Sequence, residues 1–211
     1  DRYAEALQTS TYAASTEPWD IVKAMKENLE PLIMRTREAV RWASARAGSN
    51  VFYNSTAITS RGTVNGQITA APLHNVDRLL KANRGLYFQG TMPGSDREGT
   101  SPIEASFLAF CHTNLEADLR ALPGFTVVAN YGSGKPVHPN EFGALGNKRF
   151  ITGPDYTGFA DAGASAGTTL LSTSGTNADV YPIVVLAKNA MHAIKFAGAG
   201  KEGFGNLKIV H

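Results

Sequence analysis

The sequence has one cysteine, no long apolar run and almost no net charge, and each of these absences narrows the class of protein. Cys111 cannot form an internal disulfide, which indicates a reducing compartment. No apolar run approaches the roughly 18 to 20 residues that a membrane-spanning helix needs, so we expect a soluble protein. The formal net charge of +2 does not by itself indicate a nucleic-acid or anionic-membrane binder. Hydrophobic residues make up 43% and charged residues 18%, which excludes a disordered chain.

Glycine and proline, in contrast, are abundant, with 21 and 10 residues in a chain of 211. Such a composition implies many turns and extended loops. The chain begins at Asp1 and not at Met, which leads us to expect a processed or partial product.

A long amphipathic helix is predicted over residues 19–47. Thr16 can cap it and Gly48 can end it, while Pro31 removes one backbone hydrogen bond and is expected to bend it. Four arginines fall on two nearly opposite sides of this helix, so we interpret them as solvated or salt-bridged flanks, with contacts to a neighbouring subunit or to nucleic acid as the alternative. The apolar stripe contains Ile21, Met25, Leu29, Leu32, Ile33, Val40 and Ala43.

The remainder of the chain predicts short strands and helices without regular alternation, which favours the α+β class over a doubly wound sheet. A capping box, Thr113 to Glu116, opens a short helix that Pro123 and Gly124 end. Gly-rich passages cover residues 131–147 and 153–178. A second helix is predicted at residues 75–84, a loop at 90–102, and strands at 51–53, 106–111, 126–129, 148–151, 179–187, 191–196 and 206–210.

Candidate catalytic, cofactor and metal motifs fail on their context, so none of these sites is expected. Residues 132–135 (GSGK) resemble the end of a phosphate-binding loop, but Pro136 occupies the position of the required Ser or Thr. Residues 198–203 (GAGKEG) match a dinucleotide fingerprint, but a predicted strand follows where a helix is needed. Cys111 and His112 point to opposite faces of a strand, which leaves Cys111 as a core residue. The five histidines lack zinc-site spacing.

Four segments in order along the chain nevertheless resemble one family of tailed-phage coat proteins. They are residues 46–54 (RAGSNVFYN), 60–61 (SR), 112–125 (HTNLEADLRALPGF) and 177–182 (NADVYP). The family is the major capsid proteins typified by coliphage N-four, with the Hong Kong 97 capsid fold. The resemblance extends from about residue 35 to 200. Its central block is fairly specific, while the Gly-rich stretches match only in character.

This resemblance implies a particular domain organisation. Residues 1–18 would be an arm or the end of an extended loop, residues 19–102 the peripheral domain with its spine helix at 19–47, and residues 103–211 mostly the axial domain. The spine would pack through Ile21, Met25, Leu29 and Ile33. Family members have a longer arm before the spine and a return segment after the axial domain, which again leads us to expect a partial chain. The candidate loop near the capsomer axis contains Tyr131, Gly132, Ser133, Gly134, Lys135 and His138.

The implied function is a non-enzymatic major capsid protein without cofactors. It would assemble into pentamers and hexamers of an icosahedral head around double-stranded DNA, in the cytoplasm of a bacterial host, and would end up in the virion. Scaffold, portal and possibly decoration proteins would be partners, contact with DNA would be weak and non-specific, and no membrane would be involved. Two alternatives stay open: the shell of an encapsulin-like compartment and, less favoured, an α+β enzyme acting on a small ligand.

Overall fold

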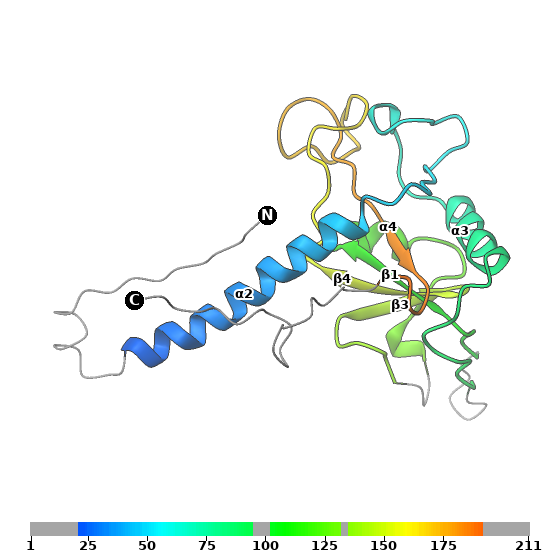
Figure 1. Cartoon of the computed structure of the whole chain (residues 1–211). Coiled ribbons are helices and arrows are strands. Elements are labelled where there is room, and N and C mark those ends of the chain that lie inside the picture. The colour runs from blue at the N-terminus through cyan, green and yellow to red at the C-terminus, as the bar shows by residue number, and fades with distance from the viewer. Residues whose placement is uncertain (1–20, 95–101, 132–134, 192–211) are drawn as a thin grey trace.

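The computed structural model describes residues 21–94, 102–131 and 135–191 of the chain (Figure 1). Within these residues, three α-helices accompany one five-stranded sheet, which fits the α+β class expected from the sequence. The expected arm at residues 1–18, the strand at 206–210 and the glycine motif at 198–203 lie outside the described residues, as does nearly all of the strand expected at 191–196. The elements are α2 (Ile21–Ala45), η1 (Arg61–Thr63), α3 (Ala70–Ala82), β1 (Phe107–His112), η2 (Thr113–Leu115), α4 (Glu116–Arg120), β2 (Thr126–Val127), η3 (Val128–Asn130), β3 (Glu141–Leu145), β4 (Lys148–Gly153) and β5 (Val184–Leu186).

The sheet has the order β2-β3-β4-β1-β5. The two central strands, β1 and β4, are parallel, and the other pairings are antiparallel. Consecutive residues of a strand point to opposite faces, and each face carries its own buried cluster. The first cluster joins Leu73 of α3 to sheet residues such as Cys111 and Phe150, and the second contains Met92, Tyr131 and Ala144.

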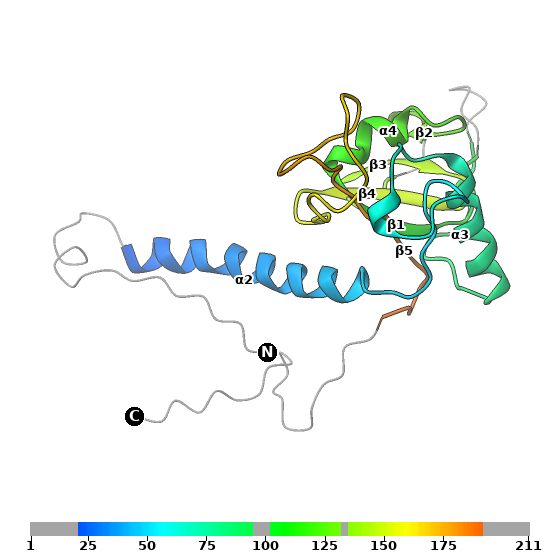
Figure 2. The same cartoon turned by 90° about the horizontal axis from the view of Figure 1, so that it is seen from above.

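One buried cluster contains residues from both sides of the predicted boundary between residues 102 and 103, and the domain division itself stays a prediction. Leu73, which precedes that boundary, is buried in the same cluster as Ala109 and Phe150, which follow it. Helix α3 therefore belongs to the unit built on the sheet. Helix α2 instead projects away from this unit as one continuous rod, and its helical hydrogen bonding continues past Pro31 (Figures 1 and 2). No helix in the described residues combines the length and the hydropathy needed to cross a membrane.

The main elements predicted from periodicity are confirmed, with shifted ends. The long helix, the second helix, the short helix near Glu116 and the strands around Phe107, Thr126, Lys148 and Val185 are all present. Helix α3 begins at Ala70 and not at residue 75, because a helix tolerates Pro72 in its first turn. Strand β5 covers only the end of the predicted strand at 179–187.

Two predictions about local structure are wrong. Residues 51–53 form no strand: they are irregular, and Val51 and Phe52 are exposed, so their apolar character does not mark a buried strand. The capping box is also absent. His112 supplies the cap, since its Nδ1 accepts a hydrogen bond from the Asn114 backbone N–H at 3.1 Å, and a 3-10 turn comes before α4.

Strand β3 lies inside a passage that its glycine content had marked as a loop. Gly143 is required there by close packing, because a Cβ at this position would overlap the ring of Phe125 and lie 2.7 Å from the Thr126 carbonyl oxygen. The glycine therefore allows β2 and β3 to approach each other beneath an aromatic ring. Its role is packing within the sheet and not turn formation.

We expect Gly143→Ala to lower the free energy of unfolding by about 1–3 kcal/mol, because the added methyl group overpacks a filled site. Urea denaturation monitored by circular dichroism measures this loss. Gly62→Ala is the matched control, since no atom lies within 4 Å of a Cβ built at Gly62. Equal stability of the two variants would contradict the packing role of Gly143.

Candidate functional site: the two faces of helix α2

Helix α2 is attached to the rest of the structure through Trp42. This side chain is only 5% exposed, and its Nε1–H donates a hydrogen bond to the Thr157 carbonyl oxygen at 2.9 Å. Its ring centroid lies 4.9 Å from that of Tyr156, which in turn packs edge-on against Phe110 of β1 at 5.7 Å. A chain of three aromatic rings thus connects the helix to the sheet.

Charged residues on the same side of α2 reinforce this attachment. Arg46 Nη1 donates to the Thr157 carbonyl oxygen at 3.2 Å, and its guanidinium lies 4.7 Å from the centre of the Phe159 ring. The guanidinium of Arg61, from the loop before α3, lies 3.5 Å from the same ring. Arg35 approaches Asp155 at 3.8 Å, but both side chains are well exposed and such a pair contributes little. We define the docking face as Arg35 and Trp42 of α2 together with Arg46, which directly follows the helix.

The apolar face of α2 lies on the opposite side of the helix. Ile33 and Trp42 are nine residues apart, and at about 100° per residue this places them on opposite sides. We define the apolar face as Met25, Leu29, Ile33 and Val40. Ile33 is 44% exposed and Val40 39% exposed, and the neighbouring Met34 is 51% exposed. These are large values for a hydrophobic stripe on a long helix.

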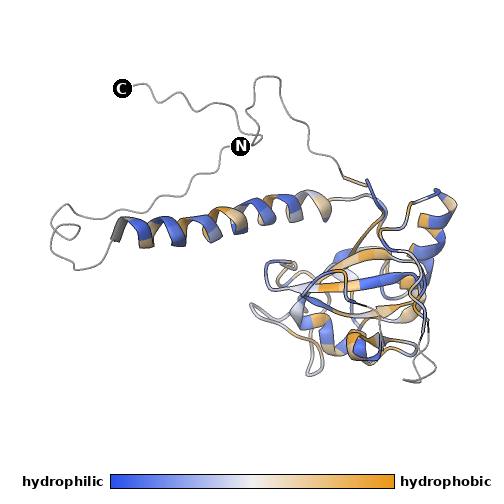
Figure 3. Ribbon diagram, turned by 90° about the horizontal axis from the view of Figure 1, so that it is seen from below, coloured by the Kyte–Doolittle hydropathy of each residue, from blue (hydrophilic) through white to orange (hydrophobic). Residues whose placement is uncertain are grey.

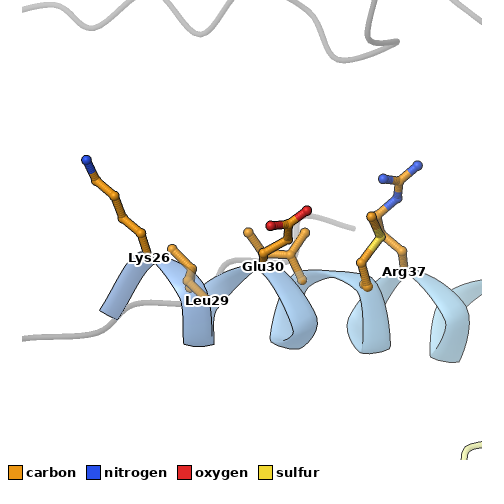
Figure 4. Close-up of a pocket in the computed structure, with 6 residues that line it drawn as sticks. Lys26, Leu29, Glu30 and Arg37 are labelled. Carbon is orange, nitrogen blue, oxygen red and sulfur yellow. The ribbon is translucent and has the colours of Figure 1, made fainter. Parts of the chain in front are cut away.

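A shallow open depression follows this face (Figure 4). Leu29, Ile33 and Met34 form its apolar floor, and Glu30 lies between Lys26 and Arg37. In the close-up, the side chains extend from one side of the helix, away from its axis. Hydrophobic and hydrophilic positions alternate along the coloured part of this helix in Figure 3. The depression is too open to enclose a small molecule, and its apolar floor with charged ends is suited to a protein surface.

The residues expected to form the packing stripe of the spine are not fully buried within the subunit. Met25 and Leu29 are half-buried and Ile33 is exposed, while Ile21 begins α2 and its side chain lies outside the description. Docking to the sheet uses the opposite face. Packing of these four residues against another surface therefore stays a prediction.

The docking face has no periodic signature in the local sequence pattern. Trp42 lies nearly opposite Ile33 and Val40, on a side of the helix that otherwise carries Arg35, Glu38 and Arg46. A single large aromatic residue among charged ones was the available signal for a second, specific contact. The partners of Trp42 lie 115 residues away, which explains why no local pattern reveals them.

Trp42→Phe should lower the free energy of unfolding by about 0.5–1.5 kcal/mol, the usual contribution of one hydrogen bond. The substitution keeps an aromatic ring near Tyr156 but removes the Nε1–H that Thr157 accepts. Thermal or urea unfolding measures the change. The exposed Ala39→Ser on the same helix is the control, and a loss at Trp42 no larger than the control's would contradict the anchoring role.

The residues predicted for the capsomer-axis loop fall into three groups. Tyr131 is buried at 1% exposure within the subunit. Lys135 and His138 are exposed. Gly132, Ser133 and Gly134 lie outside the described residues. The position of this loop near a symmetry axis stays a prediction.

A second depression, beside Phe159, is lined by His112, Asp179 and Tyr181, and its carboxylate already has partners. Asp179 accepts hydrogen bonds from the Asp161 N–H at 2.9 Å and from the Thr173 hydroxyl at 2.7 Å. Asp179 thereby closes a loop, which is a structural role. Burial lowers the pKa of His112, whose ring also packs against Tyr181.

Cys111 is a fully buried core residue, as its position in a strand predicted. Burial raises the pKa of its thiol to about 12, so it stays protonated and unreactive near neutral pH. Within the described parts of the chain, no three His, Cys, Asp or Glu side chains gather closely enough to hold a metal ion.

The chain was also compared with known proteins. No protein-family model matches it, and no curated protein matches it significantly. Neither comparison assigns the chain to a family.

Proposed function

We propose that this chain is a major capsid protein that assembles into pentamers and hexamers of an icosahedral phage head around double-stranded DNA. The observation that carries the proposal is the exposed apolar face of α2. The helix is held from its opposite side by Trp42, and Ile33 and Val40 remain open to solvent. Large exposed apolar side chains gathered on one surface are typical of a protein–protein interface.

The attachment of α2 also suits an assembly role. A helix of 25 residues is roughly 37 Å long at 1.5 Å per residue, and its anchoring residues lie in its second half. Leu29 and Ile33, in the first part of the helix, are the residues proposed to contact a neighbouring subunit. Identical subunits that contact each other through different surfaces form closed rings, and contacts between rings then form a shell.

The sequence resemblance to coat proteins of the coliphage N-four type supports the same function and suggests the Hong Kong 97 fold. On this proposal α2 is the spine helix and the sheet unit provides most of the axial domain. The protein acts without bond chemistry or a cofactor, and its location is the virion after assembly in the host cytoplasm. Scaffold, portal and possibly decoration proteins are the proposed partners, and contact with packaged DNA is weak and directed to the backbone.

Expression of the full chain with and without a phage scaffold protein tests this function. We expect ring-shaped capsomers or closed shells by size-exclusion chromatography with light scattering and by electron microscopy. A protein that stays monomeric at high concentration with scaffold present would contradict the proposal. Shells that enclose a cargo enzyme, and not DNA, would favour an encapsulin-like compartment.

A further inference from the structure

The strongest remaining feature is a fully buried carboxylate at the start of β3. The Glu141 side chain has no solvent exposure, and each of its two oxygens accepts a hydrogen bond from a residue earlier in the chain. Oε1 accepts a hydrogen bond from the Tyr131 hydroxyl at 2.7 Å, and Oε2 accepts one from the Val137 backbone N–H at 2.6 Å. The Glu141 carboxylate thus links the Tyr131 side chain to the backbone of Val137.

Further hydrogen bonds hold the end of the same segment that lies next to β3. The Glu141 N–H donates to the His138 carbonyl oxygen at 3.0 Å, and the Asn140 N–H donates to His138 Nδ1 at 3.1 Å. Thr152 of β4 donates its N–H to the Asn140 carbonyl oxygen at 3.1 Å. Lys135, Pro136, Val137, His138, Pro139 and Asn140 are nevertheless all exposed. Residues 135–140 therefore form a solvent-facing segment with a buried polar base.

The charge that balances Glu141 is also buried. The Arg149 side chain has no exposure, and its Nη1 lies 3.9 Å from Glu141 Oε1. Its Nη2 contacts the Met92 sulfur at 2.5 Å, while Nε and Nη1 have no hydrogen-bond partner among the described residues. Burial raises the pKa of Tyr131, and the hydrogen bond to Glu141 raises it further, so the phenol remains a donor.

The ion pair between Glu141 and Arg149 is buried and separated by 3.9 Å, and a pair of this kind adds little to the stability of a domain. Two charges lose their hydration, and well-packed apolar residues in their place are often equally good or better for stability. The hydrogen bonds that Glu141 accepts nevertheless give one defined shape to an exposed segment. Pro136 and Pro139 restrict the same segment further, because each fixes its own backbone φ angle.

We propose that Glu141 is a positioning residue that fixes the conformation of residues 135–140 for contact with a neighbouring copy of this chain. The subunit contact in this proposal rests on the proposed assembly function. The control of the conformation of residues 135–140 by Glu141 is a property of a single subunit and does not depend on assembly. A preformed segment lowers the entropy cost of each contact, and a ring or shell repeats that gain in every subunit.

The test uses the full chain and the paired variant Glu141→Leu with Arg149→Met, which removes both buried charges and leaves neither uncompensated. The Val137 amide is the probe, because its N–H donates directly to Glu141. We expect the paired variant to fold, its Val137 amide to exchange with deuterium at least about tenfold faster than in the wild type, and its assembly to be lost. Glu141→Gln alone leaves Arg149 without a counter-charge and is expected to unfold more easily.

Asp77→Ala with Lys148→Met is the matched control. It removes the other buried ion pair, which joins α3 to β4 and does not involve Val137 or Glu141, so exchange at Val137 and assembly should remain close to wild type. Unchanged exchange at Val137 in the paired variant overturns the positioning role. Normal assembly despite faster exchange overturns the link to the subunit contact. If the wild-type chain itself does not assemble, the proposed function fails, while the exchange rates still decide whether Glu141 positions the segment.

Discussion

Ile33→Asp is expected to abolish assembly and to leave the sheet unit folded. Ile33 is 44% exposed in the isolated subunit, so a carboxylate there remains hydrated and costs the monomer little. In an assembly the same carboxylate would enter an apolar contact without a partner, which costs several kcal/mol per interface. The cost recurs in every subunit, so even about 3 kcal/mol per contact, more than a hundredfold in affinity, would prevent shell formation. Leu29→Asp, one turn earlier on the apolar face, should act in the same way.

Asn28→Asp provides the control for this experiment. Asn28 is exposed on the same projecting half of α2, and at about 100° per residue it lies roughly 140° around the helix from Ile33. The same charge is thus placed on a different side. Circular dichroism measures folding, and light scattering with electron microscopy measures assembly. Normal assembly of Ile33→Asp would show that the apolar face is not a subunit contact, and unfolding of the sheet unit would show that it is part of a core.

Asp77→Ala should lower the free energy of unfolding by about 3–5 kcal/mol, the usual effect of removing one partner of a buried ion pair. Lys148 Nζ makes a short charged hydrogen bond to Asp77 Oδ2, and the lysine side chain has no exposure. The bond connects α3 to β4. Without Asp77, the ammonium group remains buried with only weaker neighbours, including Glu104, which acts on its pKa at longer range.

The penalty of Asp77→Ala should become smaller as the pH rises. Burial lowers the pKa of Lys148, while the hydrogen bond and charge of Asp77 raise it, so loss of Asp77 lowers it further. Between that lowered folded pKa and the ordinary value of about 10.4, the unfolded chain binds a proton that the folded variant does not. Stability of the variant therefore rises with pH over a wider window than in the wild type.

Urea denaturation at pH 6 and pH 9 measures this difference. Asp77→Ala with Lys148→Met is the control, because it removes both charges and should be much less destabilised and less dependent on pH. A penalty for Asp77→Ala that is equal at both pH values would contradict a further lowering of the Lys148 pKa in the variant within this pH range. A penalty below 1 kcal/mol would contradict the burial of the pair.

Burial of Lys148 and Arg149 could not have been predicted from the sequence. Lysine and arginine are rarely fully buried unless they are paired, and the partner of Lys148 lies 71 residues away on α3. Arg149 points to the other face of the sheet, toward Glu141. Local pattern therefore identified β4 as a strand but assigned neither charge a role.

For the candidate site and the sheet too, local sequence pattern predicted some features, while the tertiary structure alone explained others. Spacing of Leu29, Ile33 and Val40 was enough to predict the helix and its apolar stripe, because helical periodicity is a local property. Strand β3 was not predicted, because glycine is typical of turns. The tertiary structure gives a different reason for Gly143: a Cβ there would overlap the ring of Phe125, which directly precedes β2.

The sequence by itself determined the amphipathic helix, the short strands, the α+β class and the burial of Cys111, since each depends on neighbours a few residues away. Only the tertiary structure decided which side of α2 docks, because Trp42 binds Thr157 and Tyr156 across 115 and 114 residues. The apolar stripe that looked like the inner side of the helix faces away from the sheet unit. A periodic pattern specifies that one side is apolar, but the geometry of distant partners determines what that side contacts.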